Sequence, residues 1–348
     1  MRDHQSSQTQ APSSIDAANR RAPRGRTAVW AWFAGLVAFA AVLGVALSVS
    51  ELEEIARLLR RIRPVWLLAA FGLQGATYMC AAGVWKVALA RAGYEYSTRS
   101  LVPVSLAMLF ANQAVPSAGV SGSAVVLRAL GLRGVQENAA MAAVLVGLLT
   151  QYAAYVVAIA GSVLVLASAH LLNALLIWLI AIFAIGSVAV PLGILWYMKS
   201  TTSSRARDRL ARIPALGPVL VALASAPTDI IRDRLVIRRA TALQLVEIVL
   251  DASTLYVTLA ALDVWAAPLS VFASFVMAFV AARAAPTPLG LGMFEGASIG
   301  MLHLTGVQIE AALAATLLFR GYTLWLPMVP GFWCLRLVMA DRSEPGRS

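Results

Sequence analysis

Long runs of apolar residues separated by short polar segments dominate the chain. Six runs approach or exceed the roughly 20 residues that a helix needs to cross the hydrocarbon core. These predicted spans cover residues 27–49, 65–89, 139–168, 171–198, 240–262 and 311–339. A shorter run, 268–285, and two stretches around 101–130 and 286–302 are apolar too, but proline and glycine interrupt both stretches. Such residues break a simple spanning helix.

The two broken stretches resemble one another. Pro116 corresponds to Pro286 and Gly122 to Gly292, both at the same offset along the chain. Irregular backbone is tolerated at membrane depth only where protein or a wet cavity covers it, so each stretch predicts a re-entrant hairpin, near 112–125 and 284–300. Three predicted spans separate the hairpins, so they enter from opposite sides. The alternative is two chance kinks.

The predicted fold is therefore an all-α polytopic membrane protein, with about six full spans and two re-entrant hairpins arranged as an inverted repeat. The two membrane halves cover residues 27–168 and 171–339. Inverted repeats with paired broken helices are a recurring transporter architecture. The polar segment 1–26 is predicted to be a disordered tail, and residues 340–348 form a second tail.

Composition supports a membrane protein and argues against a soluble enzyme. Hydrophobic residues make up 60% of the chain and charged residues 13%, with a mean hydropathy of +0.77. Soluble domains have roughly twice that share of charge. The two cysteines lie in apolar runs and the three histidines are scattered, so we expect no disulfide framework, no metal and no cofactor.

The positive charge is concentrated on one predicted face. The net charge is +11, and 22 of the 28 Lys and Arg residues fall in 1–26, 86–99, 128–137, 199–239 and 335–348. This bias predicts that these segments and both termini are cytoplasmic. The amphipathic segment 51–64, with four arginines, is the exception. The basic loop 199–239 is expected to bind anionic inner-leaflet lipid rather than a protein partner.

Five ionisable residues lie inside apolar stretches, where each costs at least about 2.5–3.5 kcal/mol. Glu247 and Asp251 are four residues apart and share one face of a span, while Arg283, Glu295 and Arg320 flank or follow the second hairpin. In one interpretation the arginines receive a lipid phosphate, and the carboxylates release it or bind a proton. In the other, the groups form buried ion pairs that fix helix registry.

The hairpins offer a second candidate anion site, because a helix N-terminus inside the membrane presents unsatisfied N–H groups. The candidate residues are Asn112, Pro116, Gly119, Gly122, Pro286, Gly290 and Gly292. The alternative is structural. Gly292, Gly296 and Gly300 form a stripe of small residues that suits close helix packing, and interhelical hydrogen bonding is the commoner fate of an asparagine.

These motifs resemble the transmembrane region of lysylphosphatidylglycerol synthases, which also occurs in flippase-like membrane proteins of bacteria. The likeness covers about residues 30–340. It rests on residues 112–122 followed by Arg128, on residues 286–296, and on residues 317–327. Ser123 stands where many relatives carry an acidic residue. The resemblance implies lipid translocation or binding in a bacterial inner membrane, without the aminoacyl-transferase domain.

The leading functional hypothesis is a flippase-like protein that moves an anionic or modified phospholipid, or a polyprenyl-type lipid, between leaflets. One alternative is a membrane transferase with Glu247 or Asp251 as general base. Another is a non-catalytic subunit of a cell-envelope pathway. No phosphate-binding loop and no catalytic Ser-His-Asp or Cys-His set is present. The expected partners are membrane lipids. Further copies of the chain or an envelope-pathway protein are alternatives, and nucleic acid is not expected.

Overall fold

The computed structural model describes residues 62–115, 120–200, 228–284 and 290–340, together with single positions between residues 33 and 60. Every element in these ranges is helical. The elements are α4 (Pro64–Arg91), α5 (Thr98–Ala114), α6 (Val120–Leu132), α7 (Glu137–Ser168), α8 (Ala174–Ser200), α11 (Thr228–Arg232), α12 (Arg234–Ala261), α13 (Pro268–Ala284), α14 (Met293–Leu304), α15 (Ile309–Arg320), the π-helix η2 (Gly321–Trp325) and α16 (Leu326–Ala340).

Four helical stretches of the described residues are long and apolar enough to cross a membrane, namely 64–91, 137–168, 234–261 and 309–340. They confirm four of the predicted spans as helices. The predicted span 171–198 is helical as α8. The predicted span 27–49 lies outside the described residues apart from single positions, so the total of six spans stays a prediction. The chain is a multi-pass membrane protein.

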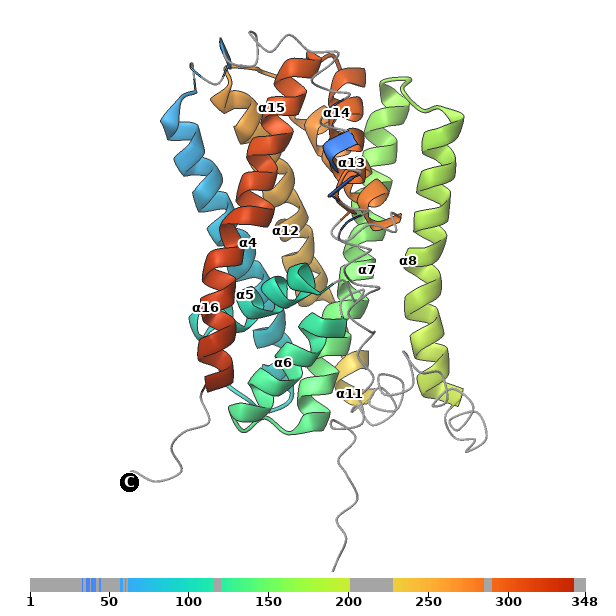
Figure 1. Ribbon diagram of the computed structural model, residues 1–348. Coiled ribbons are helices and arrows are strands. Elements are labelled where there is room, and N and C mark those ends of the chain that lie inside the picture. The colour runs from blue at the N-terminus through green and yellow to red at the C-terminus, as the bar shows by residue number, and fades with distance from the viewer. Residues whose placement is uncertain are drawn as a thin grey trace, which may run out of the picture.

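Each proline- and glycine-broken stretch separates two shorter helices. The first pair is α5 and α6, and the second pair is α13 and α14, with the helices of each pair in contact. Residues 116–119 and 285–289, between the helices of each pair, are outside the described residues. Figure 1 shows α5 and α6 in the lower half of the bundle and α13 and α14 in the upper half. The two pairs therefore lie toward opposite ends of the bundle.

Helix boundaries in the two halves recur at one offset. The number of residues from the start of α4 to the start of α12 equals the number from the end of α4 to the end of α12. The same number separates the starts, and the ends, of α5 and α13. The turns after α4 and α12 close with the same backbone hydrogen bonds: residues 92–94 donate to carbonyls of residues 89–90, and residues 262–264 to those of residues 259–260. Gly93 and Asp263, the middle residues of these turns, both have a positive φ, +87° and +61°.

α4 and α12 form an antiparallel pair that an ion pair closes at each end. Arg63, just before α4, contacts Asp263, just after α12, with Nη2 3.1 Å from Oδ1. At the other end, Nε of Arg91 lies 2.7 Å from Oδ2 of Asp233, which also caps the start of α12. Exposed ion pairs are worth about 0–1 kcal/mol, so we expect these contacts to fix the register rather than to supply most of the stability.

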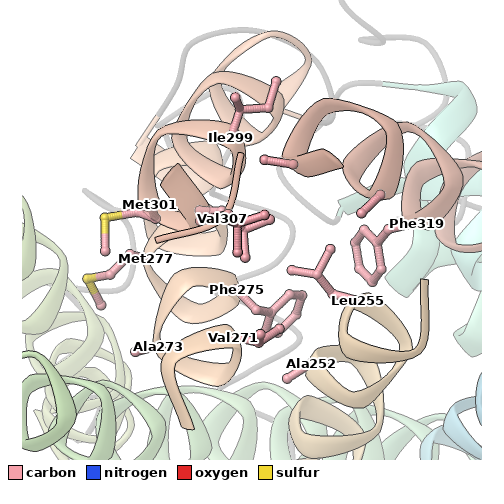
Figure 2. Packing of buried hydrophobic residues seen from close by; sticks show 14 of the residues in the cluster. Ala252, Leu255, Val271, Ala273, Phe275, Met277, Ile299, Met301, Val307 and Phe319 are labelled. Carbon is pink, nitrogen blue, oxygen red and sulfur yellow. The ribbon is translucent and has the colours of Figure 1, made fainter. Parts of the chain in front are cut away.

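The apolar core is divided between the two helix pairs. One cluster surrounds α13 and α14, where the rings of Phe275, Phe294 and Phe319 meet at centroid distances of 5.5–6.3 Å. Figure 2 shows Phe275 and Val271 of this cluster facing Leu255 and Phe319. The other cluster joins α5 and α6 to α4, α7 and the start of α12. Each pair of short helices is thus held inside the bundle by long helices.

Candidate functional site

A group of polar side chains lies halfway along α12. Glu247 is near the centre of this 28-residue helix, about 20 Å from either end at 1.5 Å per residue, and Asp251 is one turn further along. Both side chains are half-buried. A carboxylate at this depth is unfavourable unless it is neutral, paired or in contact with water or a ligand. The surroundings of the two residues therefore define the site.

α4 supplies one wall of this group. Gln74 is 3% exposed, and its Nε2 donates hydrogen bonds to Oδ1 of Asp251 at 3.0 Å and to Oγ1 of Thr254 at 3.1 Å. Tyr78 lies one turn further along α4, near enough to Asp251 and Glu247 to interact electrostatically. Its hydroxyl is buried and has no hydrogen-bond partner among the described residues. Asp251 is thus held in place, while Tyr78 keeps an unused polar group beside it.

α7 and α13 supply the opposite wall. Nη2 of Arg283 donates a hydrogen bond to the Tyr155 hydroxyl at 3.0 Å, and the guanidinium lies 4.7 Å from the centre of the Phe279 ring. None of the ion pairs among the described residues includes Arg283, and the residue is exposed. It lies about 22 Å along α13 from Pro268. The tyrosine and the ring orient this cation without neutralising it.

Glu247 is the least satisfied member of the group. Arg283 attracts its negative charge and Asp251 repels it, yet no described residue donates a hydrogen bond to its carboxylate. Within the described part of the chain, the site therefore combines two carboxylates on α12 with tyrosine hydroxyls on α4 and α7 and a cation on α13. Such a site is suited to exchange protons or to accept a charged headgroup, because its charges are only partly compensated within the protein.

Glu295 and Arg320, by contrast, pair with each other. Nε of Arg320 lies 2.6 Å from Oε1 of Glu295, which is 2% exposed, and the other carboxylate oxygen accepts the N–H of Gly292 at 2.7 Å. The guanidinium also lies 4.2 Å from the centre of the Phe294 ring. Of the two interpretations open from the sequence, this geometry favours the buried ion pair. The carboxylate therefore also satisfies one of the backbone N–H groups at the start of α14.

The first hairpin is capped in a similar way by its own side chain. Oδ1 of Asn112, on α5, accepts the N–H of Gly122 at 2.9 Å near the start of α6. A Cβ atom at position 122 would lie 2.4 Å from this oxygen, so the contact requires glycine. Nε2 of the neighbouring Gln113 donates to the carbonyl of Thr323 in η2 at 3.4 Å. Asn112 therefore joins the two arms, and Gln113 links the hairpin to the last helix.

The remaining candidates do not join the central group. Arg128 is exposed on α6. Pro116, Gly119 and Pro286 lie outside the described residues. Gly290 has φ +63°, and a Cβ there would lie 2.5 Å from Cβ of Ala282, so it serves close packing of the second hairpin.

Sequence reasoning missed the uncharged members of the site. Gln74, Tyr78 and Tyr155 lie within predicted spans, where a single uncharged polar residue carries little weight in a hydropathy pattern. One signal was available: Gln74 and Gln244 are related by the same offset as the two hairpins. Gln244 makes a matching interhelical contact, since its Nε2 donates to Oγ1 of Thr150 on α7 at 2.9 Å.

Long apolar helices, paired short helices and ionisable groups halfway along a helix long enough to span a membrane define an integral membrane protein with a group of polar side chains between its helices. The chain belongs to the family described as the lysylphosphatidylglycerol synthase TM region, whose family model matches residues 32–331. This match covers most of the chain and confirms the resemblance found in its motifs. A search of curated proteins gave no match.

Proposed function

We propose that this protein moves a lipid with a charged headgroup between the two leaflets of a bacterial inner membrane. The observation that carries the proposal is the exposed Arg283, at membrane depth, beside the half-buried Glu247 and Asp251. Membership of a family connected with lipid metabolism supports it. A headgroup cannot cross the hydrocarbon core without partners, and these side chains supply them halfway across.

Arg283 is the proposed partner of an anionic headgroup. Its contacts with Tyr155 and Phe279 orient the guanidinium but leave its charge available for a lipid phosphate. Glu247 and Asp251 are proposed to bind a proton when the phosphate is present and to help release the lipid when they are ionised. The lipid would be an anionic or modified phospholipid or a polyprenyl-type lipid.

An inverted repeat would give this site access to both leaflets. Three observations support such a repeat: the shared offset of helix boundaries, the matching turns after α4 and α12, and the position of the two short-helix pairs toward opposite ends. Alternating movement of one half against the other would then expose the site to each side in turn. The distribution of basic residues supports cytoplasmic termini.

Reconstitution into liposomes tests the proposal. Vesicles carry fluorescent phosphatidylglycerol in both leaflets, and a membrane-impermeant reductant bleaches only the outer leaflet, so loss of the protected fraction measures translocation. We expect the wild-type protein to translocate the lipid above the rate in protein-free vesicles. Arg283→Gln and Glu247→Gln should reduce the rate at least about tenfold, equivalent to about 1.4 kcal/mol.

Glu137→Gln provides the matched control, because Glu137 is an exposed carboxylate at the start of α7, away from the site. Its rate should equal that of the wild type. Wild-type rates equal to those of empty vesicles, for phosphatidylglycerol and for a fluorescent polyprenyl phosphate alike, would refute lipid translocation. A chemically altered lipid recovered from the same vesicles would instead favour the transferase alternative.

A further inference from the structure

A pocket of about 410 Å³ lies at the end of the bundle where α12 finishes, away from the central polar site. This is the upper end in Figure 1. Its walls come from the turn after α12, residues 263–267, and from the turn between α14 and α15, residues 305–308, together with Ala311. The volume falls within the roughly 300–1,000 Å³ of small-molecule sites.

At the opposite end of the bundle, the turn after α4 and the turn between α6 and α7 correspond to these two turns. Two tyrosines of the turn after α4 lie between them. The turn between α6 and α7 has the same pattern of backbone hydrogen bonds as the turn between α14 and α15. There, the hydroxyl of Tyr94 accepts the N–H of Gln136 at 3.1 Å, and the hydroxyl of Tyr96 donates to the carbonyl of Arg133 at 3.0 Å. Two phenol groups thus join the turns.

In the pocket, the positions equivalent to the two tyrosines are Val264 and Ala266, and both line its wall. The backbone groups that the tyrosines use correspond to the N–H of Gln308 and the carbonyl of Thr305. No described residue makes a hydrogen bond with either group. The pocket therefore keeps one backbone donor and one backbone acceptor, while the phenol rings that occupy the opposite end are replaced here by small side chains.

The remaining lining indicates which ring would fit. Trp265 is 57% exposed and is held edge-on against Trp66, with ring centroids 5.8 Å apart, so its indole is positioned at the pocket. Asp263 adds a half-exposed carboxylate, which is paired with Arg63 and whose oxygens can accept further hydrogen bonds from hydroxyl groups. An aromatic platform beside a carboxylate and backbone groups suits a ring that has apolar faces and hydroxylated edges.

We propose that this pocket binds a polyhydroxylated ring, either as the headgroup of a glycolipid or as a free sugar. The proposal does not depend on lipid translocation. It uses none of the residues of the central site, so the two proposals succeed or fail separately.

Native mass spectrometry of the full chain tests the proposal. The protein is purified in a detergent without a sugar headgroup and incubated with equal amounts of glucosyl-diacylglycerol and diacylglycerol. We expect the wild type to retain the glycolipid at least about fivefold over diacylglycerol, close to about 1 kcal/mol. Competition by millimolar methyl glucoside would assign recognition to the sugar itself, whereas its failure would assign it to the lipid-linked headgroup.

Two variants establish that the pocket is responsible. Val264→Tyr/Ala266→Tyr introduces the tyrosines of the opposite end and should remove the preference while the melting temperature is kept. Trp265→Ala should also remove it, and serves if the double variant does not fold. Leu269→Tyr, at a position 67% exposed just beyond the pocket, is the matched control and should behave as wild type. Equal retention of both lipids by the wild type, or a preference that persists in both variants, would overturn the proposal.

Discussion

The buried pair of Glu295 and Arg320 permits a sharp test of whether these residues serve stability or lipid binding. The test is a double-mutant cycle with Glu295→Gln, Arg320→Met and the combined variant. In the wild type the Glu295 carboxylate accepts from Nε of Arg320 at 2.6 Å and from the N–H of Gly292 at 2.7 Å, with 2% of the residue exposed. Arg320→Met therefore leaves a charge in the core with a single backbone donor.

The expected magnitudes follow from this geometry. Removing one member of a buried ion pair costs about 3–5 kcal/mol, because the other charge stays desolvated and unpaired. Glu295→Gln keeps an oxygen that can accept from Gly292 but leaves the guanidinium without its anion. The combined variant has no buried charge at this place, so its loss should be smaller than the sum of the single losses. We expect a coupling energy of about 2 kcal/mol.

The assay is unfolding in detergent, followed by tryptophan fluorescence during heating and in a titration with dodecyl sulfate. Arg320→Met should lower the melting temperature by on the order of 10 °C. Arg336→Met is the matched control: Arg336 is exposed and stacks on Phe332 at 4.4 Å, but is in none of the ion pairs among the described residues. Additive single effects below about 1 kcal/mol would refute a stabilising role for the pair.

Further predictions concern three single positions. Hydrogen bonding to Arg91 lowers the pKa of Asp233, so the stability that this carboxylate contributes is complete above the ordinary carboxylate pKa and is lost as the pH falls through the lowered value. Asp233→Asn should melt lower than the wild type at neutral pH, and should lose less of its stability on acidification. A variant that melts at the wild-type temperature at neutral pH would contradict this. Gly290→Ala should cost about 2–5 kcal/mol in chemical unfolding, because of its positive φ and its contact with Ala282, whereas Gly300→Ala, with open space around it, should stabilise α14 by about 0.5–1 kcal/mol.

The spans were predictable from hydropathy, but their exact ends were not. α12 begins at Arg234, ahead of the predicted start at 240, because Asp233 accepts the N–H groups of Leu235 and Val236 and fixes the first turn. Hydropathy excludes this basic turn from a span. The π-helix Gly321–Trp325 was not predictable either. We attribute its position to contacts between helices, such as that of Gln113 with the Thr323 carbonyl, which no local pattern encodes.

For the site, the sequence identified the charged residues but not the environment that groups them. Glu247, Asp251 and Arg283 stood out because charge is rare in apolar runs, and the structure brings them into one neighbourhood. Gln74 and Tyr155, which hold two of them, became visible only through contacts between helices that are far apart in the sequence. Those contacts depend on how the helices cross, and a hydropathy pattern does not contain that information.

The shared offset between the two halves makes the one-sidedness of this site informative. Under that offset, Glu247 and Asp251 correspond to Thr77 and Ala81, and Arg283 corresponds to Gln113. A repeat that served packing alone would not need to place every charged member of the group in one half. The charges therefore belong to a single site rather than to two equivalent ones, with Gln74, Tyr78 and Tyr155 of the other half supplying only uncharged partners. The proposed translocation would use one such site in both access states, and this asymmetry supports that proposal.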